Sequence, residues 1–142
     1  MKALILNSGL GHRMGVITNE HPKCMTEISY KDTILSRQLR QLVSFGIEEV
    51  VMTTGYYDKV LVDYCDALHL PLKFTFVNNP EYATTNYIYS IYCAKDHLKD
   101  DDVILMHGDL VFESQVMEAV MSSEKSCMAV SSTLPLPEKD YI

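Results

Sequence analysis

The stretch that decides the fold lies at the start of the chain, where residues 2–15 read KALILNSGLGHRMG. Residues 2–7 form a short, mostly apolar run, which is typical of a strand buried in a parallel sheet. The run leads into a loop with glycines at positions 9 and 11. Glycine lets the backbone approach a ligand closely and turn several N–H groups toward it. The stretch therefore predicts a buried strand that ends at an anion-binding loop.

Strands and helices alternate along the rest of the chain, after a polar loop over residues 8–30. We expect a helix that begins at Asp32 as its N-cap and ends near Phe45. The pattern favours an α/β fold, a Rossmann-like three-layer α/β/α arrangement with a mainly parallel sheet, whose ligands bind outside the carboxyl ends of the strands. Further strands are expected over residues 47–54, 72–77, 103–107 and 126–133, and further helices over residues 57–69, 85–98 and 113–123.

The glycine-containing stretch can be compared with three kinds of phosphate-binding loop. A P-loop requires Lys-Ser or Lys-Thr after its glycines, and neither follows here. A dinucleotide fingerprint requires a small residue where Met14 stands and an acidic residue where Thr53 and Thr54 stand, so it fits weakly. The third interpretation combines the glycines with Arg13 and Lys23, whose cationic side chains bind phosphate oxygens. Each cation alone is more typical of a solvated surface, but together they favour a nucleotide site.

Residues 4–25, LILNSGLGHRMGVITNEHPKCM, resemble the signature of the nucleotidyltransferase superfamily that includes the sugar-nucleotide pyrophosphorylases. The family pattern is L-x-x-G-x-G-x-R-(L/M) followed by P-K, and this chain departs from it only in small loop residues. Residues 103–109, VILMHGD, are similar to a family strand that ends in Gly-Asp. Residues 79–90, NPEYATTNYIYS, resemble a narrower branch, the phosphocholine and 2-aminoethylphosphonate cytidylyltransferases. The chain looks like the N-terminal part of such a protein.

The resemblance implies a nucleotide-diphospho-sugar transferase-like fold and a role for each matching residue. Arg13 and Lys23 would be catalytic, and Asp109 would hold Mg²⁺, a hard cation that prefers carboxylate and phosphate oxygens. Taken alone, Asp109 could equally be a turn residue, and the polar residues of the 79–86 loop could be caps or turn side chains. The implied nucleotide-binding residues are Leu6, Asn7, Ser8, Gly9, Leu10, Gly11, Asn79, Thr85 and Asn86.

Aromatic and histidine side chains lie close to these motifs. His107 precedes Gly-Asp, but the attacking oxygen of such a reaction is already anionic and needs no base, so we expect His107 to pack at the strand end. A cluster of tyrosines admits two interpretations: a cage for an ammonium group, or the core face of a helix. Its members are Tyr82, Tyr87, Tyr89 and Tyr92.

In the resembling family, an acceptor phosphate or phosphonate oxygen attacks the α-phosphorus of a nucleoside triphosphate, and pyrophosphate leaves. The chain is therefore expected to be a nucleotidyltransferase of the EC 2.7.7 type that favours CTP and a small phosphorylated or phosphonate acceptor. Two alternatives stay open. One is a sugar-1-phosphate nucleotidyltransferase that uses UTP, dTTP or GTP, and the other is a nucleotide-binding fragment without turnover.

Length and composition limit the domain number and the classes of partner that the protein can have. The length of 142 residues predicts one domain over residues 1–142, which we expect to be incomplete at its C-terminus because the last residues lack a polar tail. The net charge of −7 disfavours a nucleic-acid partner. No apolar run approaches the length of a membrane span, so we expect a cytoplasmic protein and leave open a homo-oligomer. The four widely spaced cysteines predict reduced thiols rather than a metal site.

Overall fold

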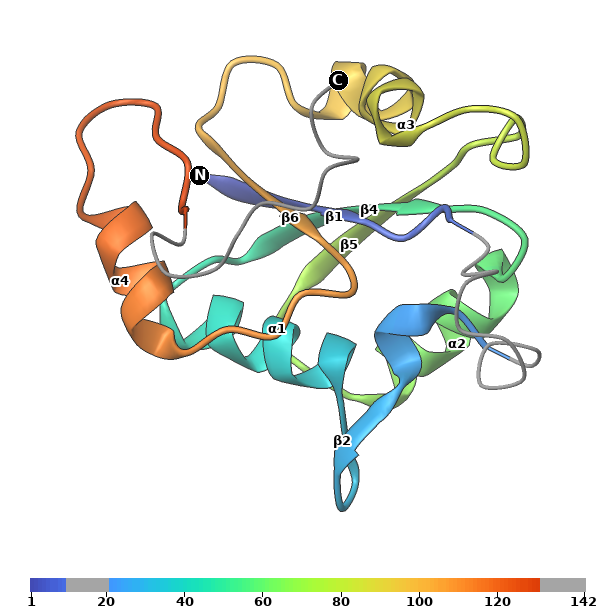
Figure 1. Ribbon diagram of the computed structural model, residues 1–142, viewed down its shortest axis with the longest axis horizontal. Helices are drawn as coiled ribbons and strands as arrows, with labels where there is room; N and C mark the ends of the chain where they lie inside the picture. The colour runs from blue at the N-terminus through green and yellow to red at the C-terminus, as the bar shows by residue number, and fades with distance from the viewer. Residues whose placement is uncertain (10–20, 131–142) are drawn as a thin grey trace. The chain divides into compact units, whose positions relative to one another are not determined.

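The computed structural model describes residues 1–9 and 21–130 (Figure 1). The chain divides into two compact units, Met1–Val111 and Phe112–Ile142, which are described separately. The described strands are β1 (Lys2–Leu6), β2 (Glu27–Ser29), β3 (Asp32–Thr33), β4 (Glu49–Thr54), β5 (Lys73–Asn78) and β6 (Val103–His107). The described helices are η2 (Lys23–Met25), α1 (Ile34–Ser44), α2 (Asp58–Ala67), α3 (Tyr87–Ala94), η3 (Lys95–His97) and α4 (Ser114–Met121).

The larger sheet of the first unit is parallel throughout, with the strand order β5-β4-β1-β6. β1 lies at its centre, where Ala3 is paired with Val50 of β4 on one side and with Ile104 of β6 on the other. The chain builds outward from β1 through β4 to β5, and then crosses back to place β6 on the other side of β1. The strand order therefore switches between β1 and β6, which is where sheets of this kind bind ligands.

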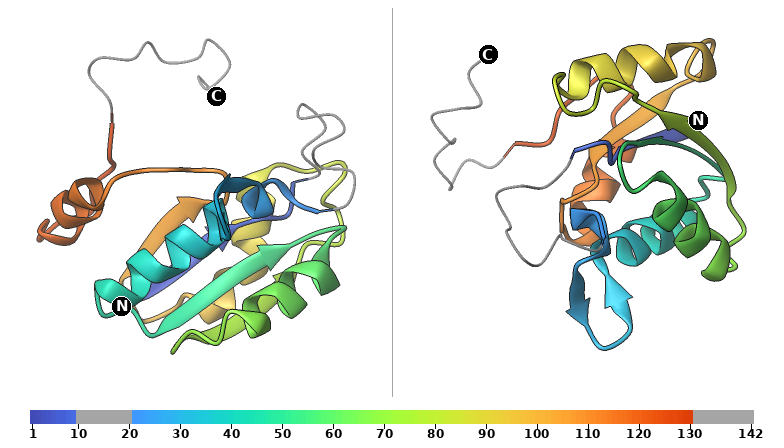
Figure 2. Two further views of the ribbon diagram at one scale, coloured as in Figure 1. Left: turned by 90° about the horizontal axis from the view of Figure 1, so that it is seen from below. Right: turned by 90° about the vertical axis from the view of Figure 1, so that its right-hand side faces the viewer.

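Helices cover both faces of this sheet. α1 and α2 lie on one face, and α3 lies on the other (Figures 1 and 2). Successive side chains of a strand point to opposite faces. Leu4 and Leu6 of β1 pack with Val51 and with Ala94 of α3, whereas Ile5 points to the face that α1 and α2 cover. The predicted three-layer arrangement with a mainly parallel sheet is confirmed.

The first helix begins one residue later than the sequence predicts. The N-cap is Thr33, whose Oγ1 accepts a hydrogen bond from Ser36 N at 3.0 Å, while Ser36 Oγ accepts one from Thr33 N at 2.9 Å. Asp32 instead pairs with Ser29 in the β2–β3 ribbon, and its carboxylate accepts a hydrogen bond from Ser36 Oγ. The prediction of Asp32 as the N-cap is wrong because the Thr33 hydroxyl, and not the Asp32 carboxylate, accepts the hydrogen bond from the backbone N–H of the first turn.

The described helices are shorter than predicted. The helix expected over residues 85–98 becomes α3, which ends at Ala94, followed by the 3-10 turn η3. The longest, α1, has 11 residues. Within residues 1–9 and 21–130, no helix has the length and apolar character that a bilayer span requires.

The second unit contains α4, which agrees with the helix expected over residues 113–123. The strand expected over residues 126–133 is wrong for residues 126–130, which form no regular element. A strand needs backbone partners on a neighbouring strand, and no pairing is made to these residues in the described part of the chain. Residues 131–133 lie outside the described residues.

Candidate functional site

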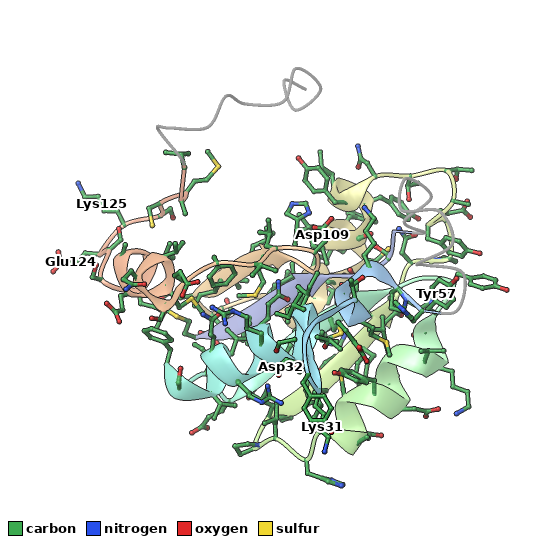
Figure 3. The ribbon with its side chains drawn as sticks, turned by 60° about the horizontal axis from the view of Figure 1, so that its bottom comes forward. Lys31, Asp32, Tyr57, Asp109, Glu124 and Lys125 are labelled. Atoms are coloured by element: carbon green, nitrogen blue, oxygen red, sulfur yellow. The ribbon has the colours of Figure 1, made fainter. Side chains whose placement is uncertain are left out.

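The carboxyl end of β6 carries a tight turn beside the carboxyl end of β1. Leu110 N donates a hydrogen bond to His107 O at 3.3 Å, which closes a β-turn around Gly108 and Asp109. Gly108 N donates to the carbonyl of Leu6, the last residue of β1, at 3.1 Å. Asp109 therefore lies at the switch in strand order, with its carboxylate half exposed (Figure 3).

Lys23 reaches the same turn from the connection between β1 and α1. It begins η2, and its Nζ lies 3.5 Å from Asp109 Oδ2. The side chain of Lys23 is 22% exposed and that of Asp109 is 48% exposed. An ion pair this open to water contributes little to stability, about 0–1 kcal/mol. The pair therefore places two charges within reach of a ligand without locking them to each other.

Asn7 follows β1 and occupies the space beside Gly108. A Cβ at Gly108 would overlap Asn7 Oδ1 and lie 3.0 Å from Leu6 O, so any larger residue there requires the Asn7 side chain to move. Asn7 N donates to Thr53 O at 3.1 Å, which also ties this residue to β4. Asn7 Nδ2 is buried and has no hydrogen-bond partner among the described residues. The end of β1 thus fixes the turn after β6 and keeps one buried donor unpaired there.

Ser8 is linked to α3 by a chain of polar side chains. Its Oγ lies 2.5 Å from Ser90 Oγ, which accepts a hydrogen bond from Asn79 Nδ2 at 3.0 Å. Asn79 Nδ2 also donates to Thr85 Oγ1 at 3.1 Å, and Asn79 Oδ1 accepts from Glu81 N at 2.9 Å. Ser8, Ser90 and Asn79 are all buried. The chain of contacts holds the loop of residues 79–86 against the end of β1.

The three residues expected near the nucleobase differ in what they present to a ligand. Asn79 is 1% exposed, and both atoms of its amide have partners within the protein. Thr85 is partly buried and donates to Glu81 O at 2.7 Å. Asn86 is exposed, and its Oδ1 caps α3 by accepting from Ile88 N at 3.0 Å. In this arrangement Asn79 shapes the loop, whereas Thr85 and Asn86 reach its surface.

Sequence reasoning assigns no site role to Gly55 or Ser90, although both support the end of β1. A Cβ at Gly55 would overlap the carbonyl oxygen of Ser8, so glycine lets β4 end directly against the loop. Ser90 receives the two polar contacts described above. A glycine directly after a predicted strand was the available signal for the first residue, and the second is the last residue of the 79–90 motif.

The tyrosines around α3 do not converge on one cage among the described residues. Tyr87 packs edge-on against His107, with ring centroids 5.1 Å apart, which confirms the packing role expected for the histidine. The Tyr92 ring lies under Lys95 Nζ at 3.7 Å. Tyr82 instead contacts a tyrosine that follows β4. The alternative, the core face of a helix, is also wrong, because the tyrosines of α3 are exposed.

Comparison with known proteins places the fold and the motifs in one family. The sequence matches the MobA-like NTP transferase domain over residues 3–134. The chain belongs to this family. It is 32% identical over 136 residues to the CMP-5'-(3-aminopropyl)phosphonate synthase of Streptomyces rubellomurinus, covering 96% of this chain and 21% of that protein. It is 30% identical over 139 residues to the CTP:phosphoglutamine cytidylyltransferase of Campylobacter jejuni, covering 94% and 53%.

A solved structure supports the same placement of this MobA-like NTP transferase domain. The CTP:phosphocholine cytidylyltransferase of Streptococcus pneumoniae matches with a TM-score of 0.60 and 28% identity, over 78% of this chain and 50% of that chain. The resemblance in the glycine loop and in the strand ending in Gly-Asp is thus a family relationship. The chain spans about half the length, or less, of the curated relatives it matches.

Nucleotidyltransferases commonly use a divalent metal, and the turn after β6 can be tested for one. The described part of this MobA-like NTP transferase domain has no group of three or more His, Cys, Asp or Glu side chains that could enclose a metal by itself. Mg²⁺ usually keeps several waters and binds through one or two carboxylates and substrate phosphates. The half-exposed Asp109 carboxylate fits that kind of site. Leu10, Gly11 and Arg13, which are also expected in the site, lie outside the described residues.

Proposed function

We propose that this domain takes part in transferring a cytidylyl group from CTP to a small phosphate or phosphonate acceptor, with release of pyrophosphate. The observation that carries the proposal is the approach of Lys23 to Asp109, 3.5 Å apart, at the switch in strand order. Because these residues come from distant parts of the chain, the fold itself brings together a cation for phosphate and a carboxylate for a metal. The cytidylyltransferases among the relatives support CTP as the donor.

The reaction asks the protein for positioning and charge compensation rather than for proton transfer. An anionic oxygen of the acceptor attacks the α-phosphorus and forms a new P–O bond. The bond from the α-phosphorus to the bridging oxygen breaks, and that oxygen leaves with pyrophosphate. Since the attacking oxygen is already ionised, no general base is required. Catalysis then rests on holding the anions in line and stabilising the charge that develops.

Each site residue has a part in this scheme. The Lys23 ammonium compensates charge on the α-phosphate and the incoming anion, and Arg13 does so on the leaving pyrophosphate. Backbone N–H groups around Gly9 and Gly11 hold the triphosphate. Asp109 would hold Mg²⁺, which when bound neutralises phosphate charge.

We assign the cytidine to the surface formed by the end of β1 and the loop of residues 79–86. Leu6, Asn7, Ser8 and Leu10 contribute the strand end and the start of the glycine loop. Thr85 and Asn86 contribute polar groups at the surface of the second loop. Asn79 supports this surface from below through Ser90 and Thr85.

Base preference is tested by thermal unfolding with Mg²⁺ and CTP, UTP, dTTP, GTP or ATP. A ligand at about a hundred times its dissociation constant stabilises the native state by roughly 2.7 kcal/mol, a clear rise in Tm for a domain of this size. We expect CTP to give the largest rise. Selective stabilisation by UTP, dTTP or GTP would favour a sugar-1-phosphate nucleotidyltransferase instead.

Turnover is tested by pyrophosphate release from CTP with phosphocholine or 2-aminoethylphosphonate as the acceptor. Lys23→Met and Asp109→Asn should each lower the rate by about 10²–10³-fold while leaving Tm nearly unchanged. Lys59→Met is the matched control, because Lys59 also pairs with an aspartate but lies exposed on α2. CTP-dependent stabilisation without any pyrophosphate release would favour a nucleotide-binding role, and equal losses in all three variants would contradict the assignment of Lys23.

A further inference from the structure

Gln38 is a buried amide in the middle of α1, on a face otherwise made of apolar side chains. It is 2% exposed, and Leu35, Leu39 and Leu42 on the same helix are fully buried. Glutamine rarely occupies such a place, because a buried amide loses its hydrogen bonds to water. The contacts of this one side chain therefore call for a physical reason.

The amide nitrogen of Gln38 bridges the two ends of the turn after β6. Gln38 Nε2 donates to His107 O at 3.0 Å and to Leu110 O at 2.8 Å. Both hydrogens of the amide are thereby used, one on each side of Gly108 and Asp109. The same turn is closed by Leu110 N donating to His107 O. A single side chain thus clamps the backbone on both sides of Asp109.

The amide oxygen of Gln38 indicates that the side chain is not buried in order to satisfy its own hydrogen bonds. Gln38 Oε1 is buried and has no hydrogen-bond partner among the described residues. An unpaired buried acceptor is unfavourable, so the amide is poorly satisfied as a core residue. What it gains is confined to the two carbonyls that bracket Asp109.

We propose that Gln38 is a positioning residue that fixes the His107–Leu110 turn and so holds the Asp109 carboxylate opposite Lys23. The consequence for catalysis rests on the proposed function, whereas the effect on the Asp109 turn does not. Gln38 itself touches no substrate in this scheme. It acts through the backbone on the one carboxylate assigned to the metal, as outer groups do that orient metal ligands.

The first measurement needs no variant and no nucleotide. Slow hydrogen exchange of both Gln38 side-chain amide protons, followed by NMR in the full chain, is expected if both are bonded inside the protein. Exchange of either proton at the rate of a solvated amide would overturn the clamp.

The second measurement compares Gln38→Met, which keeps the length of the side chain but has no donor, with Leu42→Ala. Leu42 is fully buried in the same helix, so its truncation lowers stability without removing a contact to the turn. We expect Gln38→Met to shift the Asp109 carboxyl ¹³C resonance and to weaken Mn²⁺ binding, measured by electron paramagnetic resonance with CTP present, by about 10–100-fold. Leu42→Ala should lower Tm and leave both readouts unchanged.

Gln38→Glu serves as a second variant of the same size should Gln38→Met not fold. It retains a polar group, but burial favours its neutral carboxyl, which can donate to only one of the two carbonyls, and it is expected to weaken Mn²⁺ binding in the same direction. If a folded Gln38 variant keeps the Asp109 resonance and the Mn²⁺ affinity, the positioning role is wrong. If the resonance shifts but the unaltered protein releases no pyrophosphate from any nucleotide, the proposed function falls while the effect of Gln38 on Asp109 stands.

Discussion

At the scale of single residues, Gly108 shows how closely the site is built. We expect Gly108→Ala to lower the free energy of unfolding by about 1–3 kcal/mol, because the new methyl group would overlap Asn7 Oδ1 and crowd Leu6 O. The double variant Asn7→Ala/Gly108→Ala should recover part of that loss, since the larger of the two clashes is gone. Urea unfolding of Gly108→Ala, Asn7→Ala and the double variant measures both effects.

A control separates this clash from the general effect of replacing glycine. Among the residues that the structure describes, nothing lies within 4 Å of a Cβ placed at Gly9, so Gly9→Ala should change stability far less than Gly108→Ala does. Equal losses in the two variants, or no recovery in the double variant, would mean that Asn7 does not set the space around Gly108.

Some residues of the candidate site can be predicted from the sequence, and others cannot. Lys23 and Asp109 are predicted as site residues from the family motifs around them, and the structure brings their side chains together in one ion pair. The burial of Asn79 is not predictable, since an asparagine in a turn looks the same whether its amide faces water or the protein. The role of Gln38 is not predicted for a related reason. A glutamine in a helix is usually exposed, and the residue type alone does not show that this one is buried.

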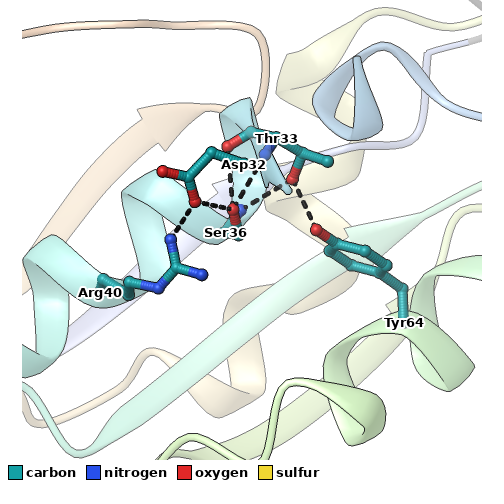
Figure 4. A network of polar contacts seen from close by, with 5 residues as sticks. All are labelled: Asp32, Thr33, Ser36, Arg40 and Tyr64. Atoms are coloured by element: carbon teal, nitrogen blue, oxygen red, sulfur yellow. Dashed lines mark hydrogen bonds and ion pairs between the residues drawn. The ribbon is translucent and has the colours of Figure 1, made fainter. Parts of the chain in front are cut away.

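At the scale of elements, the start of α1 is held by one hydroxyl oxygen that serves two partners (Figure 4). Thr33 Oγ1 accepts from Ser36 N and lies 2.8 Å from Tyr64 Oη of α2. We expect Thr33→Val to cost about 1–2 kcal/mol of unfolding free energy through loss of the cap, and Tyr64→Phe about 1 kcal/mol. The double variant should lose less than the sum of the two, because both act through the same atom.

Chemical denaturation of the single and double variants measures this coupling. Tyr30→Phe is the matched control, because Tyr30 is exposed at the ribbon between β2 and β3 and its change should stay within about 0.5 kcal/mol of the starting protein. Strictly additive losses in the double variant would show that the cap and the contact between helices are independent.

The sequence pattern predicts which strands form better than it predicts where elements begin and end. Apolar runs are enough to predict each strand of the parallel sheet, although only β1 and β4 are buried on both faces and β5 and β6 are partly exposed. The same apolar character at residues 126–130 gives no strand, since an extended segment becomes one only when a neighbour supplies backbone partners. The N-cap is Thr33 instead of Asp32 because either side chain can cap a helix, and spacing alone does not show which one accepts from Ser36 N.

At the scale of the whole molecule, burial divides the cysteines into reactive and protected thiols. Burial, with a smaller effect of Asp66, raises the pKa of Cys65 to about 12, and burial also raises the pKa of Cys24. Cys127 is exposed. We expect a thiol reagent at about pH 8 to modify Cys127 first and to reach Cys24 and Cys65 only after unfolding, because the thiolate is the reacting form. Mass spectrometry of the native and denatured protein checks this order, which prompt native-state labelling of Cys24 would contradict.

Acid should weaken the fold through exposed carboxylates paired with cations. Hydrogen bonding from Arg40 lowers the pKa of Asp32, and the N-terminal ammonium does the same for Asp101. A carboxyl whose pKa is lower in the folded state stabilises the protein above its unfolded pKa of about 3.9, and this contribution is lost as the pH falls through the folded value. Urea midpoints should therefore be flat near neutral pH and fall below about pH 4, with a shallower fall in Asp32→Asn. An unchanged midpoint down to about pH 3 would rule out this contribution.

The central position of β1 has a consequence for the order in which the protein is made. β1 precedes the other strands of its sheet along the chain, yet Lys2–Leu6 must wait for Val103–His107 before its second edge is paired. At typical synthesis rates the interval between completing β4 and completing β6 is roughly 3–10 s. Throughout that interval an apolar strand is closed on one side and open on the other, the arrangement from which strands of different chains join. The unpaired edge of β1 is therefore a risk of aggregation during synthesis, and it ends once β6 has formed.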